Sequence, residues 1–201
     1  MHSFLTVIGS LATLSSITLA APLKARQDDP QCIDGLKKIF MPEMHNIYIY
    51  EDVPEFPSTS TILNVMNGSS SNSVQDQVAV WSNIPSTATQ CSLGWAVTED
   101  RSFSVYDNGL IRFFELSGVP PAGTNITAET IAPFMEEGAK NASIDFTFWA
   151  EQTGAHTHGG GLVDCKSEMA FYLTKDMVSG GPGSVTLEQN AQNGLFLAID
   201  C

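Results

Sequence analysis

The sequence predicts an all-β protein, an antiparallel β-sandwich with two disulfides. Apolar and polar residues alternate with a period of two in several short segments, most clearly in residues 91–97. Proline, asparagine, glycine and serine separate these segments at short intervals, as expected for turns. The period of an amphipathic helix is nearly absent. About eight short strands with this spacing favour two packed antiparallel sheets.

Residues 1–20 form an expected signal peptide. An apolar, uncharged stretch runs from Phe4 to Ala20 and ends in small residues, where a signal peptidase would cut. It is too short and too polar for a membrane span, which needs about 20 apolar residues. Residues 21–26 end in Arg26 and predict a propeptide, with a plain exposed tail as the alternative. We therefore expect a secreted protein, extracellular or in the cell wall, with residues 27–201 as its single β-sandwich domain.

Four cysteines lie in the part of the chain that is expected to be exported: Cys32, Cys91, Cys165 and Cys201. An even number in an exported chain predicts two disulfides, and the spacing lacks the close pairs of a zinc site. Four cysteines allow three pairings. We favour Cys91–Cys165 within the sandwich and Cys32–Cys201 joining its ends. Each would close a long loop and stabilise the fold by about 4–5 kcal/mol in the chain-entropy model.

Three Asn-x-Ser/Thr triplets begin at Asn67, Asn125 and Asn141. In an exported chain such triplets predict N-glycosylation, which would place all three at the surface. The alternative is that they arise by chance in loops rich in serine and threonine.

The formal net charge of −13 at pH 7 limits the partners. Nucleic acids and anionic membrane surfaces attract positive charge, so we expect neither as a partner. The sequence has no second long apolar run, so no membrane span is expected in the mature chain. The expected partner is a cell-wall glycan or an extracellular protein.

The elements before residue 74 are expected as one or two helical turns at 32–40, strands at 47–50 and 61–66, and a turn at 67–72. Residues 74–97 then predict a central hairpin, because two alternating strands flank a turn around Pro85. Trp95 lies on the apolar face of the second strand and is expected in the core. Trp81 lies opposite the valines of the first strand, so we expect it to be exposed or to contact the second sheet.

The elements after residue 100 follow the same pattern. They are a hairpin of 103–106 and 110–116 around Asn108-Gly109, a short helix from Thr127 interrupted by Pro133, strands at 144–148 and 169–173, a glycine-rich loop at 155–161, and a final strand pair at 185–187 and 195–199.

Short motifs along the chain carry a family resemblance. They are Phe40-Met41-Pro42, Ile84-Pro85, Cys91-Ser92-Leu93, the run 184–189 and Gly194-Leu195-Phe196. Together they resemble the fungal ubiquitin-3-binding protein C-terminal domain family over roughly residues 40–201, whereas residues 118–141 match none of its motifs. The resemblance implies a secreted fungal β-sandwich protein, and the family name implies binding of a ubiquitin-like protein.

His156 and His158 are the candidate metal ligands. In an extended segment residues i and i+2 face the same way, so both imidazoles can reach one metal ion. A third ligand would come from His45, Glu151 or Asp164. The alternative is an exposed glycine loop that carries two solvated histidines. No other cofactor is expected.

The aromatic residues offer a second candidate site. Trp81 and Trp149, with Tyr48 and Tyr50, are candidates for a sugar-stacking platform, and ordinary core packing is the alternative. No Gly-x-Ser-x-Gly motif is present, and no catalytic residue is assigned. The expected function is a non-catalytic binding or structural module of the cell surface or wall. The alternatives are a metal-binding protein or metal-dependent enzyme, and a ubiquitin-like-protein-binding domain.

These expectations predict the mass of the mature protein. Protein from culture supernatant should begin at Ala21 or Gln27, carry N-glycan, and be lighter than its reduced form by about four hydrogens, as two disulfides require. Mass spectrometry with and without reduction and deglycosylation measures this. An intact amino terminus with four free thiols would contradict export.

Overall fold

The computed structural model describes residues 37–48, 58–68, 74–136 and 141–200. The expected signal peptide and propeptide, Cys32, Cys201 and Tyr50 lie outside these residues. The described chain folds into two antiparallel sheets with short helical turns, so the prediction of an all-β antiparallel protein is confirmed. Within these ranges, no helix is long and apolar enough to cross a membrane.

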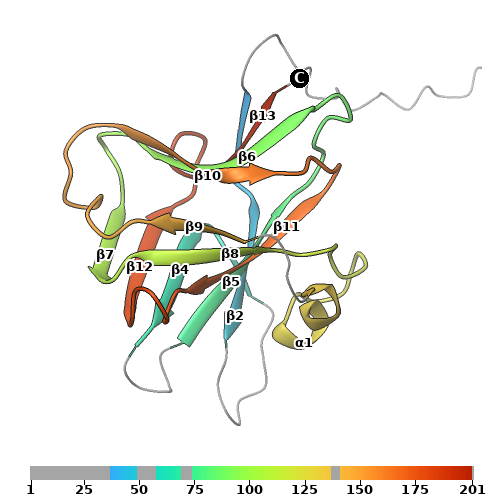
Figure 1. The fold of residues 1–201 in the computed structure, drawn as a ribbon, viewed down its shortest axis with the longest axis horizontal. Helices are drawn as coiled ribbons and strands as arrows, with labels where there is room; N and C mark the ends of the chain where they lie inside the picture. Colours follow the sequence, from blue (N-terminus) through green and yellow to red (C-terminus); the bar gives the residue numbers. More distant parts are fainter. Residues whose placement is uncertain (1–36, 49–57, 69–73, 137–140, 201) are drawn as a thin grey trace, which may run out of the picture.

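The smaller sheet has four strands, which cross the upper part of Figure 1. Their order is β1 (Lys37–Phe40), β13 (Gly194–Asp200), β6 (Gln90–Val97) and β10 (His156–Val163). β13 and β6 form its middle, and residues 194–199 of β13 are all buried. The sheet therefore joins the first described strand of the chain to the last.

The larger sheet has nine strands and lies below the first in Figure 1. Along its main path the strands are β7 (Phe103–Asp107), β12 (Gly183–Glu188), β4 (Ile62–Asn67), β5 (Val74–Trp81), β11 (Met169–Lys175), β8 (Leu110–Glu115) and β9 (Asn141–Asp145). β2 (Glu43–Tyr48) also pairs with β5, and β3 (Ser58–Ser60) pairs with β2. A single turn of helix, α1 (Ala128–Ile131), runs into the 3-10 turn Ala132–Phe134.

One hydrophobic core fills the space between the sheets. The smaller sheet contributes Leu93, Trp95, Val97, Leu195, Leu197 and Ile199, and the larger sheet contributes Trp81, Ile111, Phe113, Phe171, Leu173 and Val185, all at most 2% exposed. Burying each large apolar side chain contributes about 1.5–3 kcal/mol. The alternation of apolar residues therefore predicts the inward face of β6 and β11 correctly.

The Cys91–Cys165 disulfide joins β6 to the segment that follows β10. Its Cα atoms are 5.2 Å apart and its cysteines are 74 residues apart in the sequence. Cys91 is fully buried and belongs to the core. The favoured pairing of these two cysteines is confirmed, whereas the Cys32–Cys201 pairing lies outside the described residues.

The strand β5 is buried on both faces. Val78 and Val80 pack in a second cluster on the outer face of the larger sheet, together with Leu116, which follows β8, and Ile131 of α1. On the inner face, Trp81 is 2% exposed, and its indole N–H donates to the Ile39 carbonyl at 3.1 Å. Of the two positions expected for Trp81, contact between the sheets is therefore the observed one.

The predicted hairpins are wrong in their pairing. β5 and β6 lie in different sheets, as do β12 and β13. Each connection carries the chain across the core, so that the apolar faces of both strands point toward the same interior. β7 and β8 share a sheet, but β7 pairs with β12 while β8 pairs with β11 and β9. Alternation predicts which residues form strands, but it does not predict their partners.

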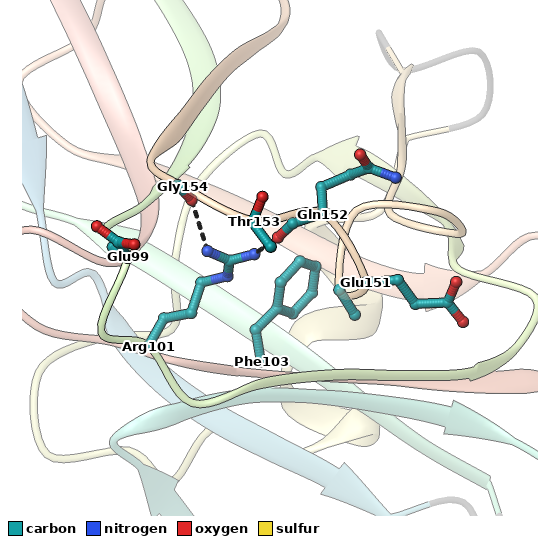
Figure 2. A pocket seen from close by; sticks show the side chains of 8 residues that line it. Glu99, Arg101, Phe103, Glu151, Gln152, Thr153 and Gly154 are labelled. Carbon is teal, nitrogen blue, oxygen red and sulfur yellow. Dashed lines mark hydrogen bonds between the residues drawn. The ribbon is translucent and has the colours of Figure 1, made fainter.

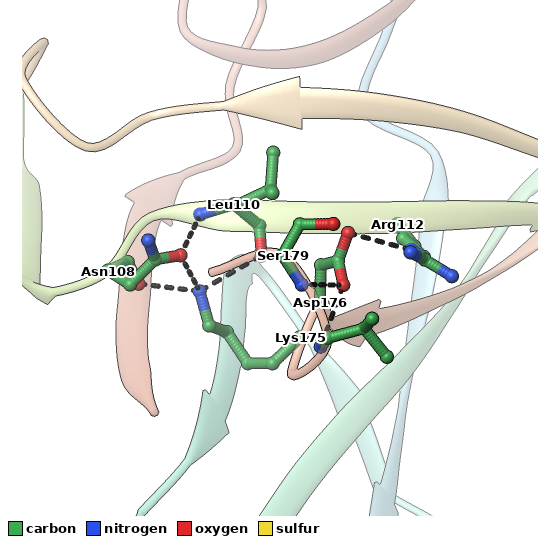
Figure 3. Close-up of polar contacts among 7 residues, drawn as sticks. Asn108, Leu110, Arg112, Lys175, Asp176 and Ser179 are labelled. Atoms are coloured by element: carbon green, nitrogen blue, oxygen red, sulfur yellow. Dashed lines mark hydrogen bonds and ion pairs between the residues drawn. The ribbon is translucent and has the colours of Figure 1, made fainter. Parts of the chain in front are cut away.

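Lys175 explains why the Asn108-Gly109 turn does not close a hairpin (Figure 3). Lys175 as a residue is 3% exposed, and its ammonium group donates to the Asn108 carbonyl at 2.5 Å, the Leu110 carbonyl at 3.0 Å and the Asn108 side-chain oxygen at 3.3 Å. These bonds attach the turn between β7 and β8 to β11, with which β8 pairs instead of with β7. Burial lowers the pKa of Lys175 to about 8, so the amine remains charged at neutral pH.

Three further expectations are wrong. Residues 37–40 form strand β1 and not a helical turn. The strand expected at 144–148 ends at Asp145, because the Asp145 carboxylate accepts the Thr147 N–H at 2.9 Å and starts a turn. The glycine-rich segment 155–161 is mostly strand β10, in which a register shift between Gly159 and Gly161 absorbs the extra residue.

Asp76 is a buried carboxyl group on β5. It is 2% exposed, its Oδ2 accepts a hydrogen bond from the Tyr172 hydroxyl, and no described residue donates to its Oδ1. Burial raises the pKa of Asp76 above its usual range. Ionisation is therefore more costly in the folded protein than in the unfolded chain.

We expect Asp76→Asn to stabilise the protein at neutral pH by about 1 kcal/mol, because it removes a buried charge that lacks a full set of donors. Because burial raises the pKa of Asp76, its ionised form destabilises the folded protein at neutral pH, and its protonated form at low pH does not. The advantage of the variant should therefore shrink as the pH falls through the raised pKa of folded Asp76, and it should be gone below about 4, the pKa of unfolded aspartate. Denaturant unfolding across pH measures this.

Asp176→Asn is the matched control. The backbone N–H of Ser179 and the Arg112 guanidinium lower the pKa of Asp176. This variant should therefore be less stable than the wild type at neutral pH, and the difference should shrink at low pH. If both variants shifted stability in the same direction, the account of Asp76 would be wrong.

Candidate functional site

Two turns meet at one end of the core and form the candidate site. One is the 98–102 turn between β6 and β7, and the other is the 146–154 turn between β9 and β10. In the second, the Trp149 N–H donates to the Phe146 carbonyl at 3.1 Å and the Gln152 N–H to the Trp149 carbonyl at 3.3 Å. The turn buries Phe146 completely and leaves Phe148 73% exposed.

Arg101 fastens the two turns together (Figure 2). Its guanidinium donates to the Thr98 carbonyl at 3.1 Å, the Gly154 carbonyl at 2.6 Å and the Gln152 carbonyl. Gly154 has a φ of +84°, a conformation that glycine adopts without strain. Hydrogen bonds from a charged group stabilise by about 1.5–3 kcal/mol each, so this contact strongly restrains the 152–154 backbone.

Two side chains near the end of the chain, those of Glu188 and Asn193, also bind the 98–102 turn. The Thr98 N–H donates to the Asn193 side-chain oxygen at 2.5 Å, and the Ser102 N–H donates to the Glu188 carboxylate at 3.1 Å. Asn193 itself donates to the same Glu188 oxygen at 2.8 Å. Residues far apart in the sequence thus fix the position of Arg101.

A pocket of about 310 Å³ lies between the two turns. Its lining comprises Glu99, Arg101, Phe103, Ala150, Glu151, Gln152, Thr153 and Gly154. In Figure 2 the Phe103 ring lies beside the Arg101 guanidinium, with Glu99 and Glu151 on opposite sides. Glu99, Glu151 and Gln152 are exposed to solvent. The pocket therefore offers one aromatic ring together with carboxylate, amide and hydroxyl groups.

An aromatic stack supports the floor of this site. The indole of Trp95 packs on Phe103 and Phe146, with ring centroids 5.7 and 5.0 Å away. The ring centroid of His158 lies 4.6 Å from that of Trp95, on which it stacks, and 3.9 Å from that of Trp149. Trp95 is 1% exposed, so its predicted place in the core is confirmed.

His156 and His158 lie on the same face of β10, with ring centroids 6.2 Å apart. The His156 Nε2–H donates to the Thr153 carbonyl at 2.9 Å, which leaves only Nδ1 for a ligand. Burial between the rings, with a smaller effect from His156, lowers the pKa of His158. His158 Nε2 is buried and has no hydrogen-bond partner among the described residues. The pair is therefore half-buried in an aromatic stack, unlike the solvated loop that was the alternative.

The structure separates the expected third ligands. Glu151 lines the pocket, Asp164 follows β10, and His45 lies on β2, where Glu43 contacts it at 3.1 Å. Across the described ranges, no three histidine, cysteine, aspartate or glutamate side chains are grouped to hold a metal ion. Metal binding by His156 and His158 stays a prediction.

The remaining predicted positions are spread over the surface and the core. Trp81 is buried and cannot stack on a sugar, whereas Trp149 and Tyr48 are half-buried. Asn125 and Asn141 are exposed, as glycosylation would require, and Asn67 is half-buried at the end of β4. N-glycosylation at all three stays a prediction.

Sequence reasoning missed the pocket. It assigned no binding role to residues 99–101, and it assigned 144–148 to a strand. The available signal was the single arginine among acidic residues at 99–101, because a guanidinium has five N–H donors that main-chain carbonyls can accept. Its partners at 152 and 154 are about fifty positions away, and no local pattern reveals them.

The chain matches no protein-family model and no curated protein. The resemblance to the fungal ubiquitin-3-binding family therefore remains a prediction.

We expect Arg101→Met to loosen the pocket, because it removes three bonds to main-chain carbonyls. Amide hydrogen exchange should accelerate at residues 98–103 and 150–154 by at least about tenfold, the equivalent of roughly 1.4 kcal/mol. Arg112→Met is the matched control, since Arg112 binds Asp176 at 2.8 Å. It should accelerate exchange near residues 176–180 only. Unchanged exchange at 150–154 in Arg101→Met would show that Arg101 does not restrain the turn.

Proposed function

We propose that this protein is a secreted, non-catalytic module that binds a cell-wall glycan in the pocket between the 98–102 and 146–154 turns. The proposed mature form is a β-sandwich that carries the Cys32–Cys201 disulfide in addition to Cys91–Cys165. One observation carries the proposal: a pre-formed pocket places the Phe103 ring among the polar side chains of Glu99, Glu151 and Gln152.

These groups match the surface of a sugar ring. A pyranose has an apolar face of C–H groups, which packs on an aromatic ring, and an edge of hydroxyls, which both donate and accept. Carboxylates accept from hydroxyls, and an amide such as that of Gln152 does both. The Thr153 hydroxyl adds a further donor and acceptor. The volume of about 310 Å³ suits one or two sugar units in an open surface site.

Rigidity supports the same function. A ligand that binds a pre-formed site loses less of its interaction energy to ordering the protein. Arg101 fixes the 152–154 backbone, and Trp95 fixes the ring of Phe103. The exposed ring of Phe148 lies on the 146–154 turn, and the Gln152 side-chain amide donates to the main-chain carbonyl of Phe148 at 3.4 Å. Phe148 can therefore add a second stacking face for a longer glycan.

Retention on purified insoluble wall polysaccharide tests the proposal. The variant Phe148→Ala/Gln152→Ala removes two exposed side chains and should weaken retention about five- to thirtyfold, the equivalent of 1–2 kcal/mol. Tyr106→Ala is the matched control, because Tyr106 is a 70% exposed ring that does not line the pocket. It should bind like the wild type.

Two outcomes would contradict glycan binding. One is no retention of the wild type on any wall fraction. The other is equal loss of retention in the Phe148→Ala/Gln152→Ala variant and the Tyr106→Ala control.

A further inference from the structure

We propose that the pocket selects glycans with free primary amines, that is, polymers of cationic amino sugars, over neutral or N-acetylated ones. This inference rests on the proposed glycan-binding function and names its substrate class. It is carried by the charges that line the pocket and by the way Arg101 is used.

The lining contains two carboxylates and one guanidinium. Glu99 and Glu151 are both exposed, and in Figure 2 they lie on opposite sides of the Phe103 ring. The other lining side chains, including Gln152 and Thr153, are neutral. A ligand in this pocket therefore lies close to more negative than positive charge.

Arg101 is used mainly to hold the turn. Its guanidinium donates to the main-chain carbonyls of Thr98, Gln152 and Gly154, which use both Nη1 donors and one of the two Nη2 donors. An acidic glycan at the remaining donors would lie near the carboxylates of Glu99 and Glu151, which repel it. The only cation in the lining is thus outnumbered by carboxylates, and the lining disfavours acidic glycans.

The aromatic ring favours a cation as well. Phe103 lines the pocket, and its ring is fixed by Trp95 at 5.7 Å and by Phe146 at 6.0 Å. An ammonium group within about 6 Å of an aromatic face is attracted by the ring. A sugar with an amine on its ring can therefore pack its C–H face on Phe103 and place its charge toward a carboxylate.

The charge of the whole protein acts in the same direction. The formal net charge is −13 at pH 7, and Asp100, next to Glu99, is also exposed. A negative field concentrates cationic ligands near the surface and repels anionic ones. Since salt screens such fields, the preference for amino sugars should fall as ionic strength rises.

Calorimetric titration of the secreted protein with three oligosaccharides of equal length tests the inference: glucosamine, N-acetylglucosamine and glucose oligomers. At low salt and mildly acidic pH, where the amines are charged, the glucosamine oligomer should bind at least about tenfold more tightly than the other two. The difference should shrink in about 0.5 M salt. The double variant Glu99→Gln/Glu151→Gln should abolish the preference.

The control is Glu129→Gln, because Glu129 is exposed on α1 and does not line the pocket. It should keep the preference of the wild type. A circular dichroism spectrum equal to that of the wild type checks that the double variant is folded, and both glutamates are exposed, so we expect it to be.

The other outcomes overturn the inference in distinguishable ways. Equal affinity for all three oligomers would overturn the choice of amino sugars and leave glycan binding intact. A lysine peptide of equal charge that binds as tightly as the glucosamine oligomer would show that the pocket recognises charge without sugar. Failure to bind any oligomer, together with no retention on wall material, would overturn both proposals.

Discussion

The contacts of Trp95 link the core of this protein to its surface site. The indole lies on β6 of the smaller sheet and is almost completely buried between the sheets. It packs on Phe103 from β7, on Phe146 and Trp149 from the 146–154 turn, and on His158 from β10. Since close-packed interiors transmit small displacements, the position of this one ring sets the positions of both turns. The pocket is thus an extension of the core, although its polar groups face solvent.

Polar side chains fix the turns that connect the strands, which the alternation of apolar and polar residues does not determine. Lys175 binds the turn between β7 and β8, Arg101 binds the 152–154 backbone, and Asn193 binds the start of the 98–102 turn. Each side chain makes hydrogen bonds with main-chain groups of a turn, and such bonds contribute about 0.5–3 kcal/mol each. In all three cases a side chain from a distant part of the chain meets a turn. Contacts with distant parts of the chain therefore help to order these three turns.

The sequence predicts the strands of this fold better than their pairing. Period-two alternation locates β5, β6 and β11, and cysteine counting finds the Cys91–Cys165 pair. Alternation reports only which side of a strand is apolar, and strands that face one core from opposite sheets have the same pattern. Asn108-Gly109 predicted a hairpin between β7 and β8 that is not observed, because the Lys175 ammonium group of β11 binds this turn. The pocket escaped prediction since Arg101 and its partners at 152–154 meet only after the sheets have formed.

The pairing of β1 with β13 has a consequence for synthesis. Lys37 lies opposite Ile199, so the smaller sheet joins the first and last described strands of the chain. A fold dominated by such distant pairings forms slowly, because long loops must close before their contacts can stabilise anything. The sheet cannot be completed until residues 194–200 have left the ribosome. A nascent chain of this protein thus waits, with β6 and its tryptophan uncovered on one edge, until β13 arrives.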